Sequence, residues 1–122
     1  MAKILVVDDH VDLAENLAEI LTLFGHEAVV AASAEAGLVR IAAGDIQVII
    51  TDFRLPGRSG ADLIAELRQR QVQIPAVLIS AYTDDDTIAA ALEAGAREVL
   101  PKPVDIGHLM PLVERLLLQP GL

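Results

Sequence analysis

The sequence predicts an α/β fold with a doubly wound parallel sheet, on the strength of three observations. Short apolar runs rich in Val and Ile recur along the chain without polar alternation, which is typical of strands buried on both faces. Segments with apolar residues at three- and four-residue spacing separate these runs, as in amphipathic helices. Five such alternations indicate a (βα)5 three-layer sandwich with right-handed crossovers.

The strands are the apolar runs themselves, each too short for a buried helix. The runs have two to five residues, far fewer than the roughly ten or more of a typical buried helix. The predicted strands are Ile4–Val7, Ala28–Ala32, Val48–Ile50, Ala76–Ile79 and Val99–Leu100.

The helices between them are bounded by capping residues. Gly25 and Gly44 stand where left-handed residues would end the first and second helices. Ser33, Asp84 and Asp105 are suitable N-caps for the second, fourth and fifth helices. The side chains expected to face the core are Ala14, Leu17, Ala18 and Leu21, then Leu63, Ile64 and Leu67, then Ile88, Ala91 and Leu92, and finally Leu109, Val113, Leu116 and Leu117.

Pro111 conflicts with a regular fifth helix. It has no N–H group to donate, and its ring clashes with the preceding turn. The sequence therefore predicts either that this helix starts late or that its first turns are irregular.

Composition narrows the class of protein. The 122 residues, 53% of them hydrophobic, predict one domain over 1–122, with 119–122 as a tail or the start of a linker. The absence of cysteine excludes disulfides and thiolate metal sites. Apolar runs are too short for a membrane span or a signal peptide, so a cytoplasmic location is expected.

The charge balance bears on partners. The formal net charge is −9, and no basic stripe is present, which argues against nucleic-acid binding by this chain. An acidic surface suits a basic protein partner or a divalent cation.

Polar residues collect where the predicted strands end. The carboxyl ends of parallel strands share one edge of the sheet, and ligands bind there at the switch in strand order. In the flavodoxin-like order 2-1-3-4-5, the switch lies between the first and third strands. The residues concerned are Asp8 and Asp9 after the first strand, Thr51 and Asp52 after the third, Ser80 after the fourth and Lys102 after the fifth.

Three carboxylates at one edge repel one another. Two charges about 4 Å apart repel by about 4 kcal/mol at an effective dielectric near 20. Magnesium removes this cost because it takes carboxylate, water and phosphate oxygens as ligands. A carboxylate beside it can act as a nucleophile in phosphoryl transfer. Lys102 and Ser80 could then supply a cation and a hydroxyl.

Four segments together resemble the receiver domain of bacterial two-component response regulators. The likeness covers nearly the whole chain, and the segments occur in the family's order and at its spacings. They are VVDDH at 6–10, TDFRLPGRSG at 51–60, LISAYTD at 78–84 and GAREVLPKP at 95–103.

The resemblance implies a phosphoacceptor site at Asp52. The phosphoryl donor would be a histidine kinase or a phosphotransfer protein. Mg²⁺, or Mn²⁺ as an alternative, would be bound by Asp9, by Asp52, by the backbone carbonyl of Arg54, and by Asp8 through water. The chain would assist its own phosphorylation and dephosphorylation without being an enzyme.

The resemblance also assigns the neighbouring polar residues. Lys102 would pair with a phosphoryl oxygen, and Ser80 would move towards the phosphoryl group as the switch residue. The peptide bond before Pro103 would be cis. The chain would be a monomer or a phosphorylation-dependent dimer, with a downstream output domain or protein as a further partner.

Two positions depart from the family pattern or vary within it. Val99 stands where the family usually has an aromatic switch residue, so Tyr82 is considered as a substitute. Arg54, two residues after Asp52, overlooks the site and is expected to tune the lifetime of the phosphoryl group. Gly57 and Gly60 are interpreted as turn residues, and His10 is given no role.

Three rival functions remain open to test. A magnesium-dependent phosphatase with an aspartate nucleophile usually has an acid two residues after the nucleophile, where this chain has Arg54. A nucleotide-binding module would need a Gly-rich loop after the first strand, and DDHVD stands there instead. A degenerate receiver would act only as a protein-interaction module.

Overall fold

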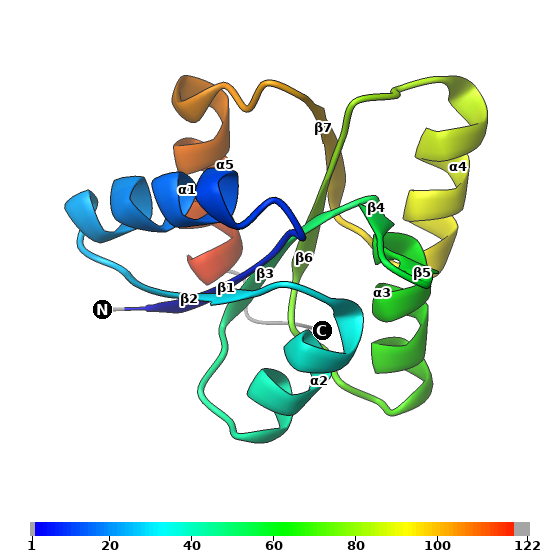
Figure 1. Cartoon of the computed structure of the whole chain (residues 1–122), viewed down its shortest axis with the longest axis horizontal. Coiled ribbons are helices and arrows are strands. Elements are labelled where there is room, and N and C mark those ends of the chain that lie inside the picture. The colour runs from blue at the N-terminus through cyan, green and yellow to red at the C-terminus, as the bar shows by residue number, and fades with distance from the viewer. Residues whose placement is uncertain (1, 119–122) are drawn as a thin grey trace.

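The computed structural model describes residues 2–118, which form a five-stranded parallel sheet between two layers of helices (Figure 1). The sheet order is β2-β1-β3-β6-β7, which is the predicted 2-1-3-4-5 order once a short hairpin, β4–β5, is set aside. The strands are β1 Lys3–Val7, β2 Glu27–Ala31, β3 Val48–Asp52, β6 Ala76–Ser80 and β7 Glu98–Pro101.

Five helices cover the sheet. In Figure 1, α1 and α5 lie on one face, and α2, α3 and α4 lie on the other. They are α1 Val11–Leu23, α2 Ala34–Ala42, α3 Gly60–Gln69, α4 Asp85–Ala94 and α5 Ile106–Leu118. No helix of residues 2–118 is long and apolar enough to cross a bilayer. The tail predicted at 119–122 lies outside the described residues.

Each strand contributes to two cores. In β1, Ile4 and Val6 pack towards α1 and α5, whereas Leu5 and Val7 pack towards α2, α3 and α4. Successive side chains point to opposite faces, so a strand covered on both sides must be apolar at every position. This requirement explains why the sequence showed runs without alternation.

The predicted caps are present. Ser33 Oγ accepts a hydrogen bond from Ala36 N–H at 3.1 Å, and Asp84 Oδ1 accepts one from Thr87 N–H at 2.9 Å. Asp105 Oδ1 likewise accepts from Gly107 N–H at 2.9 Å. Gly25 and Gly44, beyond the ends of α1 and α2, have φ values of +91° and +94°, which glycine adopts without steric cost. The polar and turn residues therefore mark the helix ends as predicted.

Two predictions about the helices were wrong. Leu92 is 50% exposed, because Ala91 is the residue of α4 that is buried in the core. The fifth helix neither starts late nor loses its helical form in the first turns, since α5 begins at Ile106 and continues through Pro111. Pro111 and Gly107 are both exposed, so water can reach the Gly107 carbonyl that Pro111 cannot bond. Among the other predicted core-facing residues, Ala18, Ile88 and Leu117 are partly buried.

The strand boundaries also differ in detail. β3 runs two residues further than predicted and includes Asp52 itself, and β2 ends at Ala31, one residue early. After β3, the segment read only as a turn forms an antiparallel hairpin of β4 Arg54–Leu55 and β5 Arg58–Ser59. Gly57, with φ of +74°, makes its turn as expected. This hairpin carries the chain from Asp52 into α3.

Candidate functional site

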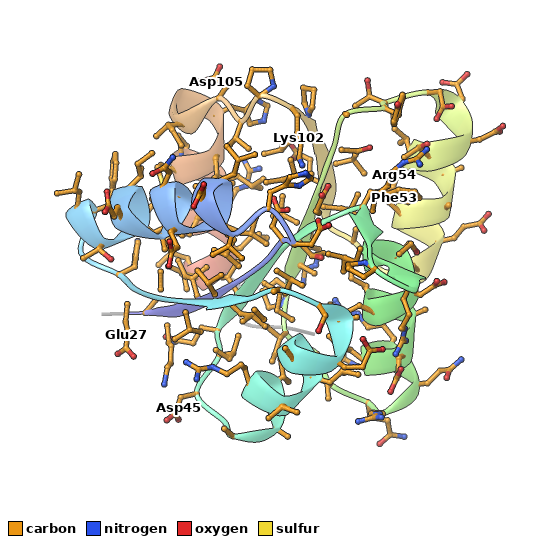
Figure 2. The ribbon with its side chains drawn as sticks, in the orientation of Figure 1. Glu27, Asp45, Phe53, Arg54, Lys102 and Asp105 are labelled. Carbon is orange, nitrogen blue, oxygen red and sulfur yellow. The ribbon has the colours of Figure 1, made fainter. Side chains whose placement is uncertain are left out.

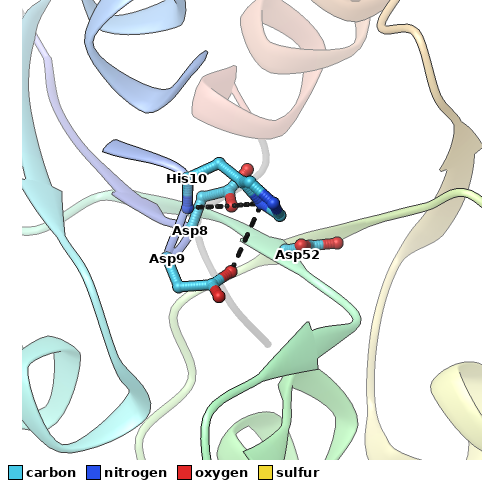
Figure 3. Close-up of side chains that lie close together, drawn as sticks. All are labelled: Asp8, Asp9, His10 and Asp52. Carbon is cyan, nitrogen blue, oxygen red and sulfur yellow. Dashed lines mark hydrogen bonds and ion pairs between the residues drawn. The ribbon is translucent and has the colours of Figure 1, made fainter. Parts of the chain in front are cut away.

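Three carboxylates meet at the edge where β1 and β3 end. Asp8 and Asp9 follow β1, and Asp52 is the last residue of the adjacent β3. One carboxylate oxygen from each of them, and one ring nitrogen of His10, lie within 4.8 Å of one another (Figure 3). The parallel pairing of Val7 with Thr51 produces this meeting, because it aligns the ends of the two strands.

Lys102 reaches this cluster from the end of β7. Its Nζ donates a hydrogen bond to Asp52 Oδ2 at 3.1 Å and lies 3.8 Å from Asp8 Oδ2. Its backbone N–H donates to the Ser80 carbonyl at 2.9 Å, which holds the segment after β7 against the end of β6. The Lys102–Pro103 peptide bond is cis. Figure 2 labels Lys102 and Arg54, both in the upper half of the view.

Burial sets the electrostatics of Asp52. Its side chain is only 7% exposed, and this desolvation raises the pKa of the carboxyl above its ordinary value. The negative charge of Asp8 raises this pKa further, whereas the hydrogen bond and the charge of Lys102 lower it. The ionised carboxylate of Asp52 is therefore stabilised by Lys102 and destabilised by its surroundings.

The donor set of the site suits a hard divalent cation. When ionised, the carboxylates of Asp8, Asp9 and Asp52 carry three negative charges against the one positive charge of Lys102, an excess of two. The oxygens are close enough to share one ion, and Asp9 remains 39% exposed for access from solvent. Oxygen ligands and partial hydration are what Mg²⁺ prefers in proteins.

Ser80, Tyr82 and Arg54 form a second group beside the carboxylates. Ser80 is buried at the end of β6, and its Oγ accepts a hydrogen bond from Tyr82 N–H at 3.0 Å. The guanidinium carbon of Arg54 lies 4.9 Å from the centre of the Tyr82 ring, in a cation–π contact. Within residues 2–118, no hydrogen bond joins Ser80 to a carboxylate. The structure thus places Ser80 at the predicted edge, with its hydroxyl engaged elsewhere.

Val99 contributes to the core. It lies in β7, paired with Leu78, and is partly buried against the core beneath α2, α3 and α4. The exposed aromatic side chain next to the site is instead that of Tyr82, which is 56% exposed.

Gly60 has a role that its interpretation as a turn residue missed. It is the buried first residue of α3, and a Cβ added there would lie 2.2 Å from the carbonyl oxygen of Asp52. Its N–H donates to the Phe53 carbonyl at 2.7 Å, and Thr51 Oγ1 donates to the Asp52 carbonyl at 3.0 Å. Only glycine permits this close approach of two backbone segments. Nothing in the local sequence separates such a glycine from a turn glycine.

His10, which was given no role from the sequence, lies beside two of the carboxylates. Its Nδ1 lies 3.3 Å from Asp8 Oδ1 and 3.4 Å from Asp9 Oδ1. The sequence contained an indication of this position, because His10 directly follows Asp8 and Asp9. Histidine is so common outside metal sites that its position alone did not decide the matter.

Comparison with known proteins agrees with the fold. The family model described as "Response regulator receiver domain" matches residues 4–114. A response regulator receiver protein of Anaeromyxobacter sp. (strain Fw109-5) is 38% identical over 92% of this chain and 47% of its own length. The chain therefore spans about half of that relative.

Solved structures of response regulators share the fold of this chain. The receiver domain of the Francisella response regulator 1452 superposes with a TM-score of 0.92 at 26% identity, over 98% of both chains. The response regulator TrrA of Thermotoga maritima, solved in complex with Mg²⁺-BeF, is 30% identical and has a TM-score of 0.82, over 95% of this chain and 99% of TrrA. The chain belongs to the response regulator receiver domain family and is the receiver domain of a two-component response regulator.

Proposed function

We propose that this receiver accepts a phosphoryl group on Asp52 from a phosphohistidine of a histidine kinase or a phosphotransfer protein. The observation that carries the proposal is the buried Asp52 carboxylate, which lies next to Asp8 and Asp9 and 3.1 Å from the ammonium group of Lys102. The family supports this role, and the sequence argues against two rivals: its net charge of −9 disfavours nucleic-acid binding, and DDHVD stands where a nucleotide-binding module would have a Gly-rich loop.

The transfer is a displacement at phosphorus. A carboxylate oxygen of Asp52 forms the new O–P bond as the P–N bond to the donor imidazole breaks, and the leaving nitrogen keeps the electron pair and is protonated. Such reactions depend mainly on positioning and on neutralising oxygen charge. Lys102 is placed to pair with a phosphoryl oxygen, because it already contacts the attacking carboxylate.

Magnesium, or manganese in its place, would supply the remaining positive charge. Asp9, Asp52 and the backbone carbonyl of Arg54 would bind the ion directly, and Asp8 would do so through water. The Mg²⁺-BeF complex of TrrA supports this assignment by similarity. The excess of negative charge among the side chains of this site supports it independently.

The response to phosphorylation would begin at Ser80. Its hydroxyl would leave the Tyr82 N–H, which it accepts from at 3.0 Å, and turn towards the phosphoryl group. The movement would shift the segment that carries Tyr82, and with it the cation–π contact to Arg54. With Val99 in place of an aromatic switch residue, Tyr82 is the side chain that would signal the change to an output domain or protein.

A phosphorylation assay tests the proposal. The protein is incubated with Mg²⁺ and acetyl phosphate, and its intact mass is measured. We expect one phosphoryl adduct, which is absent in Asp52→Asn, retained in the exposed control Asp86→Asn, and reduced by chelation of Mg²⁺. A degenerate receiver would give no adduct. An aspartate-nucleophile phosphatase would release phosphate from many substrates without a lasting adduct.

A further inference from the structure

We propose that His10 is an additional metal ligand, and that it makes the acidic site bind Zn²⁺ in competition with Mg²⁺. The inference rests on the proposed function, since it concerns the same metal site. It adds a ligand and a second class of ion, and it makes the receiver sensitive to divalent transition metals.

The donor atoms have the spacing of ligands on one ion. His10 Nδ1 lies 3.3 Å from Asp8 Oδ1 and 3.4 Å from Asp9 Oδ1. Two ligands about 2.05 Å from one Zn²⁺ in tetrahedral geometry lie roughly 3.4 Å apart. All three side chains, together with Asp52, keep one ligand atom each within 4.8 Å of the others. Small side-chain adjustments could therefore bring them onto one ion.

The backbone holds His10 in this position. Its N–H donates to Asp8 Oδ1 at 2.9 Å, which closes a tight turn between the strand and the helix. His10 is the N-cap residue of α1, yet its side chain makes no capping hydrogen bond to the helix. The imidazole is directed instead towards the carboxylates of Asp8 and Asp9, as Figure 3 shows. It remains 65% exposed, so an ion can reach it from solvent.

The ligand preferences of the two ions explain why His10 would favour Zn²⁺ over Mg²⁺ at this site. Mg²⁺ is a hard ion that takes oxygen ligands in an octahedral shell, so it gains little from an imidazole. Zn²⁺ and the neighbouring transition ions bind imidazole nitrogen well and bind such mixed sites more tightly than harder ions do. His10 thus stabilises the transition-metal form of the site selectively. Zn²⁺ held by His10 and the acids would occupy the place that phosphoryl transfer requires for Mg²⁺.

The other two histidines provide controls. His26 Nε2 pairs with Glu114 Oε1 at 2.7 Å, and His108 Nε2 pairs with Glu98 Oε2 at 2.9 Å, each with a single acid and away from the cluster. His108 is exposed like His10, so His108→Asn matches His10→Asn in chemistry and burial.

Calorimetric titration of the wild type, His10→Asn and His108→Asn with Zn²⁺ and with Mg²⁺ tests the inference. We expect His10→Asn to weaken Zn²⁺ binding by at least about tenfold, which is the lower end of what loss of even an outer-shell partner causes. Mg²⁺ binding should change less than about twofold in the same variant. His108→Asn should leave both affinities unchanged. In the wild type, Zn²⁺ and not Mg²⁺ should shift the ring-nitrogen NMR signals of His10.

Equal Zn²⁺ affinity in the wild type and His10→Asn, or unshifted His10 ring signals at saturating Zn²⁺, would overturn the inference. Retained Mg²⁺ binding and a retained acetyl phosphate adduct would then leave the proposed function standing. If instead Mg²⁺ binding were insensitive to Asp9→Asn and Asp52→Asn, and no adduct formed, the proposed function itself would be wrong and the inference would fall with it.

Discussion

Nζ of Lys102 lies 3.1 Å from Oδ2 of Asp52 and 3.8 Å from Oδ2 of Asp8, so one ammonium group pairs with carboxylates at the ends of two neighbouring strands. Because the side chain of Lys102 is itself 24% exposed, its charge is screened less than that of a surface lysine. It compensates part of the negative charge of the site and leaves the rest for a divalent cation.

Replacing Lys102 should slow phosphorylation. Lys102→Met removes the cation next to the attacking oxygen of Asp52, and we expect adduct formation with acetyl phosphate to slow by about 10²-fold, as when one charge-stabilising donor is lost. Lys102→Arg should recover part of the rate of adduct formation, since arginine keeps the positive charge but not the compact shape of the ammonium group. The control is Lys3→Met, which removes a partly buried lysine that pairs with Glu27 at the start of β1. A Lys102→Met protein that is phosphorylated at the wild-type rate would contradict the role assigned to this residue.

Asp52→Asn should stabilise the metal-free protein at neutral pH. The ionised carboxyl group is destabilised by burial and by Asp8, and the neutral amide removes both effects. Replacing the carboxylate also removes a charged partner of Lys102, so we expect a net gain in the free energy of unfolding on the order of 1 kcal/mol. Urea unfolding of both proteins in a chelator measures the difference. Mg²⁺ at 100 times its dissociation constant should stabilise the wild type by about 2.7 kcal/mol, which exceeds the gain expected for Asp52→Asn.

The advantage of Asp52→Asn should depend on pH. The pKa of Asp52 is higher in the folded chain than its ordinary value of 3.8, so the folded state binds this proton more tightly. Above its folded-state pKa, the ionised Asp52 therefore lowers the free energy of unfolding. This destabilisation disappears as the pH falls through that pKa and Asp52 is protonated. The difference between the two proteins should shrink over this range and vanish below about 3.8. A difference that grows on acidification would show that Asp52 is stabilised as a carboxylate.

The sequence was sufficient to predict which residues lie at the functional edge of the sheet, but not the close contacts between backbone segments. The apolar runs identified the strands, and parallel pairing then required Asp8, Asp52 and Lys102 to share an edge. That inference needs only topology. The role of Gly60 depends on a backbone separation of ångströms between β3 and α3, which no local pattern encodes. Leu92 was misplaced because α4 packs through small residues, so a period of 3.6 did not reveal the narrow buried face.

Arg68 should be important for stability although it lies away from the site. Its guanidinium donates to the carbonyls of Val72 at 2.8 Å, Ile74 at 2.9 Å and Gly95 at 3.3 Å, and so joins α3, the segment before β6 and the end of α4. Arg68→Met leaves these carbonyls without a donor, and we expect a loss of about 2–3 kcal/mol in the free energy of unfolding. Arg70→Met, which removes an exposed ion pair with Glu66, should cost less than about 1 kcal/mol. Equal losses in the two variants would count against this role.

The Arg54–Tyr82 contact should lengthen the lifetime of the phosphoryl group. The two side chains lie beside the site, and losing their contact would give water easier access to Asp52. An exposed cation–π pair contributes about 0.5–1 kcal/mol, so Arg54→Ala and Tyr82→Ala should each speed loss of the adduct by about twofold to fivefold. The double variant should be no faster than either single one. Additive effects, seen by following the intact mass after removal of acetyl phosphate, would show that the residues act separately.

Gly60→Ala should both destabilise the protein and impair phosphorylation. Within a helix, replacing Gly by Ala is ordinarily favourable by up to about 1 kcal/mol. At Gly60 the new Cβ would lie 2.2 Å from the Asp52 carbonyl oxygen, so α3 and the end of β3 must separate. We expect a loss of about 1–3 kcal/mol, the usual range for overpacking, and slower adduct formation because Asp52 moves relative to Lys102. Gly107→Ala in α5 is the matched control, since its Cβ meets only the side chain of Asp105, at 3.2 Å. Opposite signs for the two substitutions in urea unfolding would identify backbone crowding as the cause, whereas a stabilised Gly60→Ala protein would refute it.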